Sequence, residues 1–135
     1  MAKEHIQPAE IFDSEAFGYT QVVTATNEKL VFVSGQTGLD QKFQLVGPGD
    51  LAAQAEQALE NLRSALAACG GVPGDVTSLR IYVVDYQPEC ARELAGPLTR
   101  FFAGAKPSAQ TLIGVQALGM PELRVEIEAT AAIAS

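Results

Sequence analysis

The sequence predicts an α+β fold in which a small mixed sheet carries two helices on one face. Segments with strand and helix patterns follow one another in the order strands, helix, strand, helix, strands. Residues 51–69 repeat apolar side chains at helical spacing, and residues 123–129 alternate strictly between apolar and polar side chains. No third helix is predicted for the second face of the sheet, so we expect subunit packing to cover it.

The N-terminal part of the chain has strand character. Residues 1–18 lack a long periodic run and are expected to form a short edge strand or an extended arm, with His5 exposed. Residues 19–26 and 30–34 are rich in β-branched and apolar side chains and are predicted strands. The segment 35–38 (Gly-Gln-Thr-Gly) indicates either a turn that needs a positive φ or a backbone that approaches a ligand closely.

The most regular element of the sequence is the first helix. A short strand is expected over residues 41–46, and Asp50 is then a good N-cap for a helix over residues 51–69. The Gly70-Gly71 pair supplies the residue type that a left-handed C-terminal cap needs.

The second half of the chain predicts a strand, a helix and two further strands. Residues 76–84 read as a strand, and residues 89–103 as a helix that is kinked at Pro97 or begins just before it. Residues 110–115 and 123–129 are the predicted last strands, joined as a hairpin by a short connection around Gly119-Met120-Pro121.

Charged residues lie on one face of the last strand. Arg124 and Glu126 are predicted to stand about 6–7 Å apart there. Two interpretations are open at this point: a solvated strand face, or a polar site that a neighbouring strand completes.

Composition limits the classes of function. The 135 residues suit one domain that spans residues 1–135, and 47% of them are apolar. The formal charge of −7 and the scattered arginines disfavour nucleic-acid binding. No apolar run is long enough to cross a membrane, and the N-terminus lacks a signal-peptide layout, so we expect a cytoplasmic protein with no membrane partner.

Metal and disulfide chemistry are not expected. Cys69 and Cys90 are predicted to be reduced thiols, with Cys69 on the apolar face of the first helix. One histidine and two separated cysteines have no metal-ligand spacing, so no metal site is predicted.

The ordered segments together resemble the RidA family, also called YjgF or the endoribonuclease L-PSP family. Each segment is weak evidence alone, whereas their order and spacing are specific and span nearly the whole chain. The matching segments are 18–23, 30–37, 50–62, 74–77, the Phe101-Phe102 pair and 125–131.

The resemblance implies a fold, an assembly and an activity. Family members are similar to bacterial chorismate mutase in fold, form homotrimers and hold small ligands in clefts between subunits. The best-known activity is the hydrolysis of reactive enamines and imines to a 2-keto acid and ammonia, without a cofactor. In that chemistry a guanidinium holds the substrate carboxylate, and a glutamate positions or activates the attacking water.

The resemblance also implies site residues. Glu126 matches the water-handling glutamate, Tyr19 matches an aromatic residue of the N-terminal segment, and Ser34-Gly35-Gln36 matches a strand end that lines the cleft. These residues are the expected catalytic group and its substrate-binding neighbours.

One position departs from the family pattern. The family's arginine follows a Pro-Ala pair, and in the segment 107–110 (Pro-Ser-Ala-Gln) that place is taken by Gln110 or its neighbours. Gln110 is therefore expected to recognise a neutral polar group of the substrate. Arg124 beside Glu126 either compensates for the missing charge or is a surface residue.

Three functions remain as hypotheses. The first is a diverged imine or enamine hydrolase, and the second is a non-catalytic trimer that binds a small metabolite or a partner protein in the same cleft. The third is a ribonuclease, which the acidic charge makes the weakest.

Overall fold

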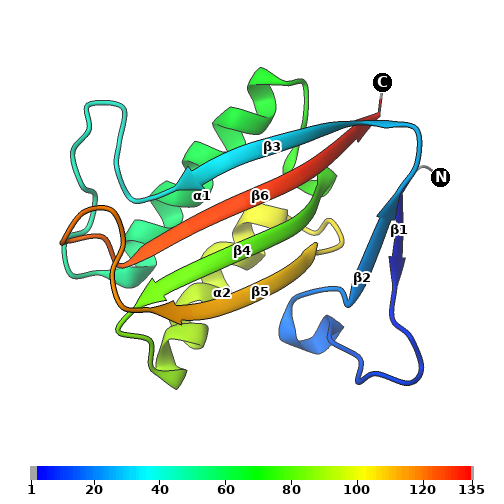
Figure 1. The fold of residues 1–135 in the computed structure, drawn as a ribbon, viewed down its shortest axis with the longest axis horizontal. Coiled ribbons are helices and arrows are strands. Elements are labelled where there is room, and N and C mark those ends of the chain that lie inside the picture. Colours follow the sequence, from blue (N-terminus) through cyan, green and yellow to red (C-terminus); the bar gives the residue numbers. More distant parts are fainter. Residues whose placement is uncertain (1–2, 135) are drawn as a thin grey trace.

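The computed structural model describes residues 3–134. A four-stranded sheet has the strand order β3-β6-β4-β5, and a separate two-stranded sheet pairs β1 with β2 (Figure 1). The strands are β1 (Lys3–Ile6), β2 (Val22–Ala25), β3 (Glu28–Gln36), β4 (Val76–Val84), β5 (Ala109–Val115) and β6 (Val125–Ala134). The helices are α1 (Leu51–Ala68) and α2 (Pro88–Phe102), with one-turn helices η1 (Glu15–Phe17) and η2 (Pro73–Asp75).

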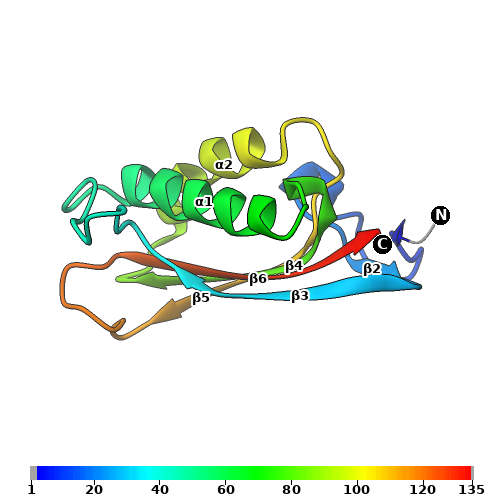
Figure 2. The same cartoon turned by 90° about the horizontal axis from the view of Figure 1, so that it is seen from above.

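The molecule has two layers. Figure 2 shows α1 and α2 side by side on one face of the four-stranded sheet, while no described helix lies on the other face. The prediction of an α+β fold with two helices on one face of a mixed sheet is confirmed. We call the uncovered side the open face of the sheet.

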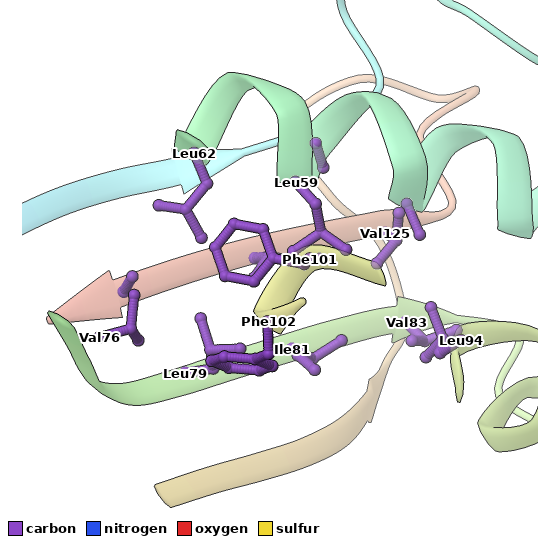
Figure 3. Packing of buried hydrophobic residues seen from close by; sticks show 14 of the residues in the cluster. Leu59, Leu62, Val76, Leu79, Ile81, Val83, Leu94, Phe101, Phe102 and Val125 are labelled. Atoms are coloured by element: carbon purple, nitrogen blue, oxygen red, sulfur yellow. The ribbon is translucent and has the colours of Figure 1, made fainter. Parts of the chain in front are cut away.

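The hydrophobic core lies between the helices and the sheet (Figure 3). Phe101 of α2 is 1% exposed and lies at its centre, close to Leu59 and Leu62 of α1. From the sheet, Ile81 of β4 and its register partner Ile127 of β6 are fully buried. Since side chains alternate across a strand, their sequence neighbours must face the open side.

Helix α1 begins and ends as the sequence predicts. The Asp50 carboxylate accepts a hydrogen bond from the Ala53 backbone N–H at 3.0 Å. At the other end, Gly70 has a φ of +81°, which only glycine adopts without strain, and the Gly71 N–H donates to the Leu66 carbonyl at 2.8 Å.

The predicted hairpin of the last two strands is wrong. β5 pairs in parallel with β4, and β4 pairs antiparallel with β6, so β4 lies between β5 and β6. The chain leaves β4, passes through α2 and returns as β5, and such a helical crossover places the returning strand parallel to the first. The short connection after β5 therefore passes the end of β4 to reach β6 (Figure 1).

The strand predicted over residues 19–26 is shorter in the structure and begins at Val22. The Thr20 N–H donates to the Ser108 carbonyl at 2.9 Å, and the Thr20 hydroxyl donates to the Pro107 carbonyl at 2.6 Å. These bonds join residue 20 to the entry of β5 instead of to a strand ladder.

The strand predicted over residues 41–46 is also absent from the described structure. A single bridge joins Leu39 to Leu45. Between them, the Asp40 carboxylate accepts two backbone N–H bonds from the residues that follow it, each 2.9 Å long. Side-chain bonds of this kind compete with a strand ladder and favour a turn.

Helix α2 begins at Pro88 and includes Pro97, so the prediction of a start just before Pro97 is wrong. Proline suits a first helical position, where its missing N–H has no helical partner. Pro97 in the interior costs one helical hydrogen bond. Its burial with the apolar face of α2 offsets that cost.

Gln54 is a fully buried side chain of α1 that joins three backbone segments. Its amide donates to the Gly47 and Glu122 carbonyls at 3.2 and 3.3 Å, and its oxygen accepts from the Arg124 N–H at 2.8 Å. We expect Gln54→Leu to lower the free energy of unfolding by about 2–4 kcal/mol, because the Gly47 and Glu122 carbonyls and the Arg124 N–H lose their partner in the protein interior. Urea unfolding at fixed protein concentration measures this. Exposed Gln116→Leu is the control, and equal stability of the two variants would contradict the account.

His5 is not exposed as the sequence suggested. It is half-buried in β1 opposite Val23, and its buried Nε2 has no partner among the described residues. Burial lowers the pKa of His5, and the nearby positive charges of Lys106 and Lys3 lower it further. In the folded chain, the protonated imidazole is therefore disfavoured.

The lowered pKa of His5 predicts a pH dependence of stability. The unfolded chain takes up a proton near the ordinary value of 6.5, while the folded chain resists it. The stability that the folded chain gains by keeping His5 neutral is thus present above that pH and is lost as the pH falls below it. We expect His5→Gln to reduce the loss of stability between neutral pH and mildly acidic pH, measured by urea unfolding. Identical pH profiles for the natural chain and the variant would refute this.

Candidate functional site

The open face of the sheet carries both apolar and charged side chains. Leu30 and Phe32 of β3 are 60% and 76% exposed, and Ile113 of β5 is 40% exposed. Polar side chains from β4 and β6 lie between these two edges. Large apolar residues that share one exposed face indicate a surface that another molecule covers.

Glu126 lies on this open face. It is the register partner of Tyr82, whose neighbours in β4 are buried in the core. Its carboxylate lies against Gly35: a Cβ built on Gly35 would be 1.9 Å from Oε2 of Glu126. Only a residue without a side chain leaves room for the carboxylate in this position.

The backbone beside Glu126 is irregular. The β3–β6 register shifts between Val33 and Gln36, so Ser34 and Gly35 form a bulge in β3. The Gln36 side-chain amide donates to the Ser34 carbonyl at 3.0 Å. The three predicted strand-end residues, Ser34, Gly35 and Gln36, are therefore brought to the β3 segment that borders Glu126.

The second glutamate of β6, Glu128, already has a hydrogen-bond partner. The Tyr82 hydroxyl donates to the Glu128 carboxylate at 2.6 Å, and this bond raises the pKa of Tyr82. Glu126, in contrast, makes no side-chain hydrogen bond or ion pair with the residues from 3 to 134. Its carboxylate is thus available to a ligand or a water molecule.

A cavity of about 700 Å³ lies on the other side of the sheet, between α2, β5 and the segment 15–19. Tyr19 and Gln110 line it. Most of the remaining wall is apolar or small. The wall residues contributed by α2 are Ala91, Arg92, Leu94, Ala95, Leu98, Thr99 and Phe102.

The sequence-predicted residues therefore fall into two groups. Gln110 pairs with buried Leu79 and faces the helix side, whereas Glu126 pairs with Tyr82 on the open side, and β4 separates their strands. Within one subunit, the structure does not bring Gln110 to Glu126. The β5 residues next to Gln110 that face the open side are Ala109 and Thr111, the partners of Ser78 and Arg80.

The Arg124 side chain does not join Glu126 in the candidate site. Its Nε donates to the Val84 carbonyl at 3.2 Å, and its Nη2 is 4.0 Å from the Cys90 sulfur. The guanidinium thus holds the end of β4 against the start of α2. This position favours a structural role for Arg124 over a compensating charge.

Sequence reasoning missed the contribution of α2 to the cavity. Ala95 and Leu98 belong to an apolar helix face, which alone indicates core packing. Their position beside the cavity depends on where β5 lies, and the mistaken hairpin had placed β5 elsewhere. Over residues 3–134, no group of three or more His, Cys, Asp or Glu side chains is arranged to hold a metal ion. No helix of the described chain is long and apolar enough to cross a membrane.

These features define a small-molecule-binding α+β protein: a half-covered sheet, a free carboxylate beside a glycine bulge, and an apolar cavity. The chain belongs to the endoribonuclease L-PSP family, whose model matches residues 13–133.

Relatives of known structure and sequence agree with this assignment. A protein of unknown function of the conserved Rid family, YyfB from Yersinia pestis, is 38% identical with a TM-score of 0.94, over 98% of this chain and 100% of that one. Protein DfrA of Myxococcus xanthus is 38% identical over 84% of this chain and 83% of its own. TdcF of Escherichia coli, solved with bound serine, is 25% identical with a TM-score of 0.67, over 76% of this chain and 80% of that one.

Proposed function

We propose that the chain assembles as a homotrimer whose open sheet faces pack together. The exposed Phe32 and Leu30 on β3 and Ile113 on β5 support this, because burying them would remove apolar surface from water. β3 and β5 are the two edge strands of the sheet. A closed ring can therefore place the β3 edge of one subunit beside the β5 edge of the next.

We propose that the ligand site forms at this boundary. The Glu126 and Gly35 half would come from one subunit, and the Tyr19 and Gln110 half from its neighbour. The separation of these groups within one subunit supports the arrangement, since one ligand can meet both only if two copies contribute.

The activity we propose is hydrolytic deamination of a small imine, or of an enamine after its conversion to the imine. Glu126 accepts a proton from a water molecule as the water oxygen bonds to the imine carbon. The proton then moves to the nitrogen, which gives the carbinolamine. The carbinolamine hydroxyl next loses its proton, the same nitrogen gains a proton, the carbon–nitrogen bond breaks as the carbonyl forms, and a carbonyl product and ammonia leave. The observation that carries this proposal is the unpaired carboxylate of Glu126 against Gly35.

The kind of ligand is supported by a relative. TdcF was solved with bound serine, so a related fold holds a molecule the size of an amino acid. In this chain, the neutral Gln110 suits a neutral polar group of the substrate. The acidic charge of −7 gives no support to a ribonuclease activity.

A non-catalytic binding protein is the second candidate. The lack of an arginine in the segment 107–110 favours it, because a charge-assisted bond to a substrate carboxylate is lost there. A binder would show saturable binding of small metabolites by calorimetry with no ammonia release at any concentration.

Ammonia release from 2-iminopropionate generated in situ tests the activity. We expect turnover by the natural chain, and its sedimentation as a trimer. Activity only in Gln110→Arg would mean that the cleft is intact and its specificity has changed. Inactivity of both proteins on this substrate and on imines with larger side chains would overturn the proposed reaction in favour of the binding role.

A further inference from the structure

The cavity between α2 and β5 has an unsatisfied polar group in its wall. The Gln110 carboxamide oxygen is buried and has no hydrogen-bond partner among the described residues. A buried acceptor without a donor is destabilising, so such groups are normally paired. A ligand with an N–H or O–H group would supply the missing donor.

Among the described residues, Arg92 of α2 is the one cationic side chain in the wall of this cavity. The arginines at 63 and 100 are each paired with a glutamate. Arg92 forms no ion pair within residues 3–134, and its side chain is exposed. A planar guanidinium that is free at the edge of a cavity suits a carboxylate.

The remainder of the cavity is predominantly apolar. Leu98, Phe102 and Leu112 are among its walls, and its volume of about 700 Å³ lies within the range of small-molecule sites. A ligand that fills it would have an apolar or aromatic body larger than a methyl group. Glu15 also lines the cavity, and it would disfavour a second negative charge on the ligand.

We propose that this cavity binds a monocarboxylic acid with an apolar or aromatic body, and that Arg92 and Gln110 determine this specificity. Arg92 pairs with the carboxylate, and the Gln110 oxygen accepts a hydrogen bond from an N–H or O–H of the ligand. The inference rests on the proposed function in one respect: the acid bound here is the substrate on which Glu126 of the neighbouring subunit acts.

Matched probes test the proposal on the full chain. Three acids carry both features: para-hydroxybenzoate, para-hydroxyphenylacetate and indoleacetate. Their primary amides lack the negative charge, and their O-methyl or N-methyl derivatives lack the donor. Isothermal titration calorimetry gives the dissociation constants, and shifts of the Gly104 and Ala105 backbone amides, which line the cavity, report the location.

We expect at least one acid to bind about tenfold tighter than its amide and its methylated derivative. Arg92→Gln should remove the preference for the acid over the amide. Arg100→Gln, on the same helix but outside the cavity, should leave it unchanged. Gln110→Leu should remove the preference for the unmethylated probe.

Two results would overturn the inference: no acid binds the natural chain, or Arg92→Gln and Arg100→Gln have equal effects on all three acids. Binding by Glu126→Gln separates this inference from the proposed reaction. Probes that bind this variant as well as the natural chain, without ammonia release by either, would refute the reaction alone. Glu126-dependent ammonia release without probe binding would refute the assignment of Arg92 and Gln110 alone.

Discussion

Mixed trimers of Glu126→Ala and Ala95→Trp subunits, each inactive alone, are expected to regain about a quarter of the natural rate of ammonia release. Ala95→Trp fills the cavity beside α2 from an exposed helix position. In the proposed trimer, each site needs an intact Glu126 from one subunit and an intact cavity from its neighbour. With equal amounts and random assembly, about one site in four has both.

A matched control comes from two variants in the same half of the site. Gly35 and Glu126 lie together on one open sheet face, so mixing Gly35→Ala with Glu126→Ala subunits should restore no activity. The experiment uses co-expressed subunits with different tags and a purified mixed trimer. If the Glu126→Ala and Ala95→Trp mixture is as inactive as its parents, the two halves do not come from different subunits.

Gly35→Ala is expected to lower the rate of ammonia release about a hundredfold while the trimer stays folded. The added Cβ would lie 1.9 Å from Oε2 of Glu126 and 2.6 Å from its carboxyl carbon, so the carboxylate must move. The side chain is long and can turn away, and we therefore expect a loss of stability of only about 1 kcal/mol. Ammonia assays and urea unfolding measure the two effects separately.

Gly119→Ala is the control for this substitution. No heavy atom lies within 4 Å of a Cβ at Gly119, so neither activity nor stability should change. If Gly35→Ala releases ammonia at the rate of the natural chain, the position of the Glu126 carboxylate beside the β3 bulge has no catalytic importance.

Local sequence signals predicted the elements whose causes are local. Asp50 and Gly70 mark the two ends of α1, and both could be predicted because capping needs only a few neighbouring residues. The strand over 76–84 has the predicted bounds, since its alternation of buried and exposed side chains follows the period of two. The resemblance placed Gly35 near Glu126, and the structure shows the two in contact distance.

These local signals do not predict which strands are neighbours in the sheet. Alternation tells which side chains share a face, but it does not tell which strand lies beside which, and so β5 was placed next to β6 instead of β4. The cavity and the proposed role of Arg92 depend on how α2 lies over β5, which the side-chain pattern within each element does not specify.

The most direct test of the central claim is the rate of ammonia release by Glu126→Gln at saturating substrate. This change keeps the size of the side chain and removes its ability to accept a proton from water. We predict a loss of about 10²–10⁴-fold, with the trimer and its affinity for the acid probes preserved. A rate within about twofold of the natural chain would mean that Glu126 does not handle the water, and that the open-face site is not the site of hydrolysis.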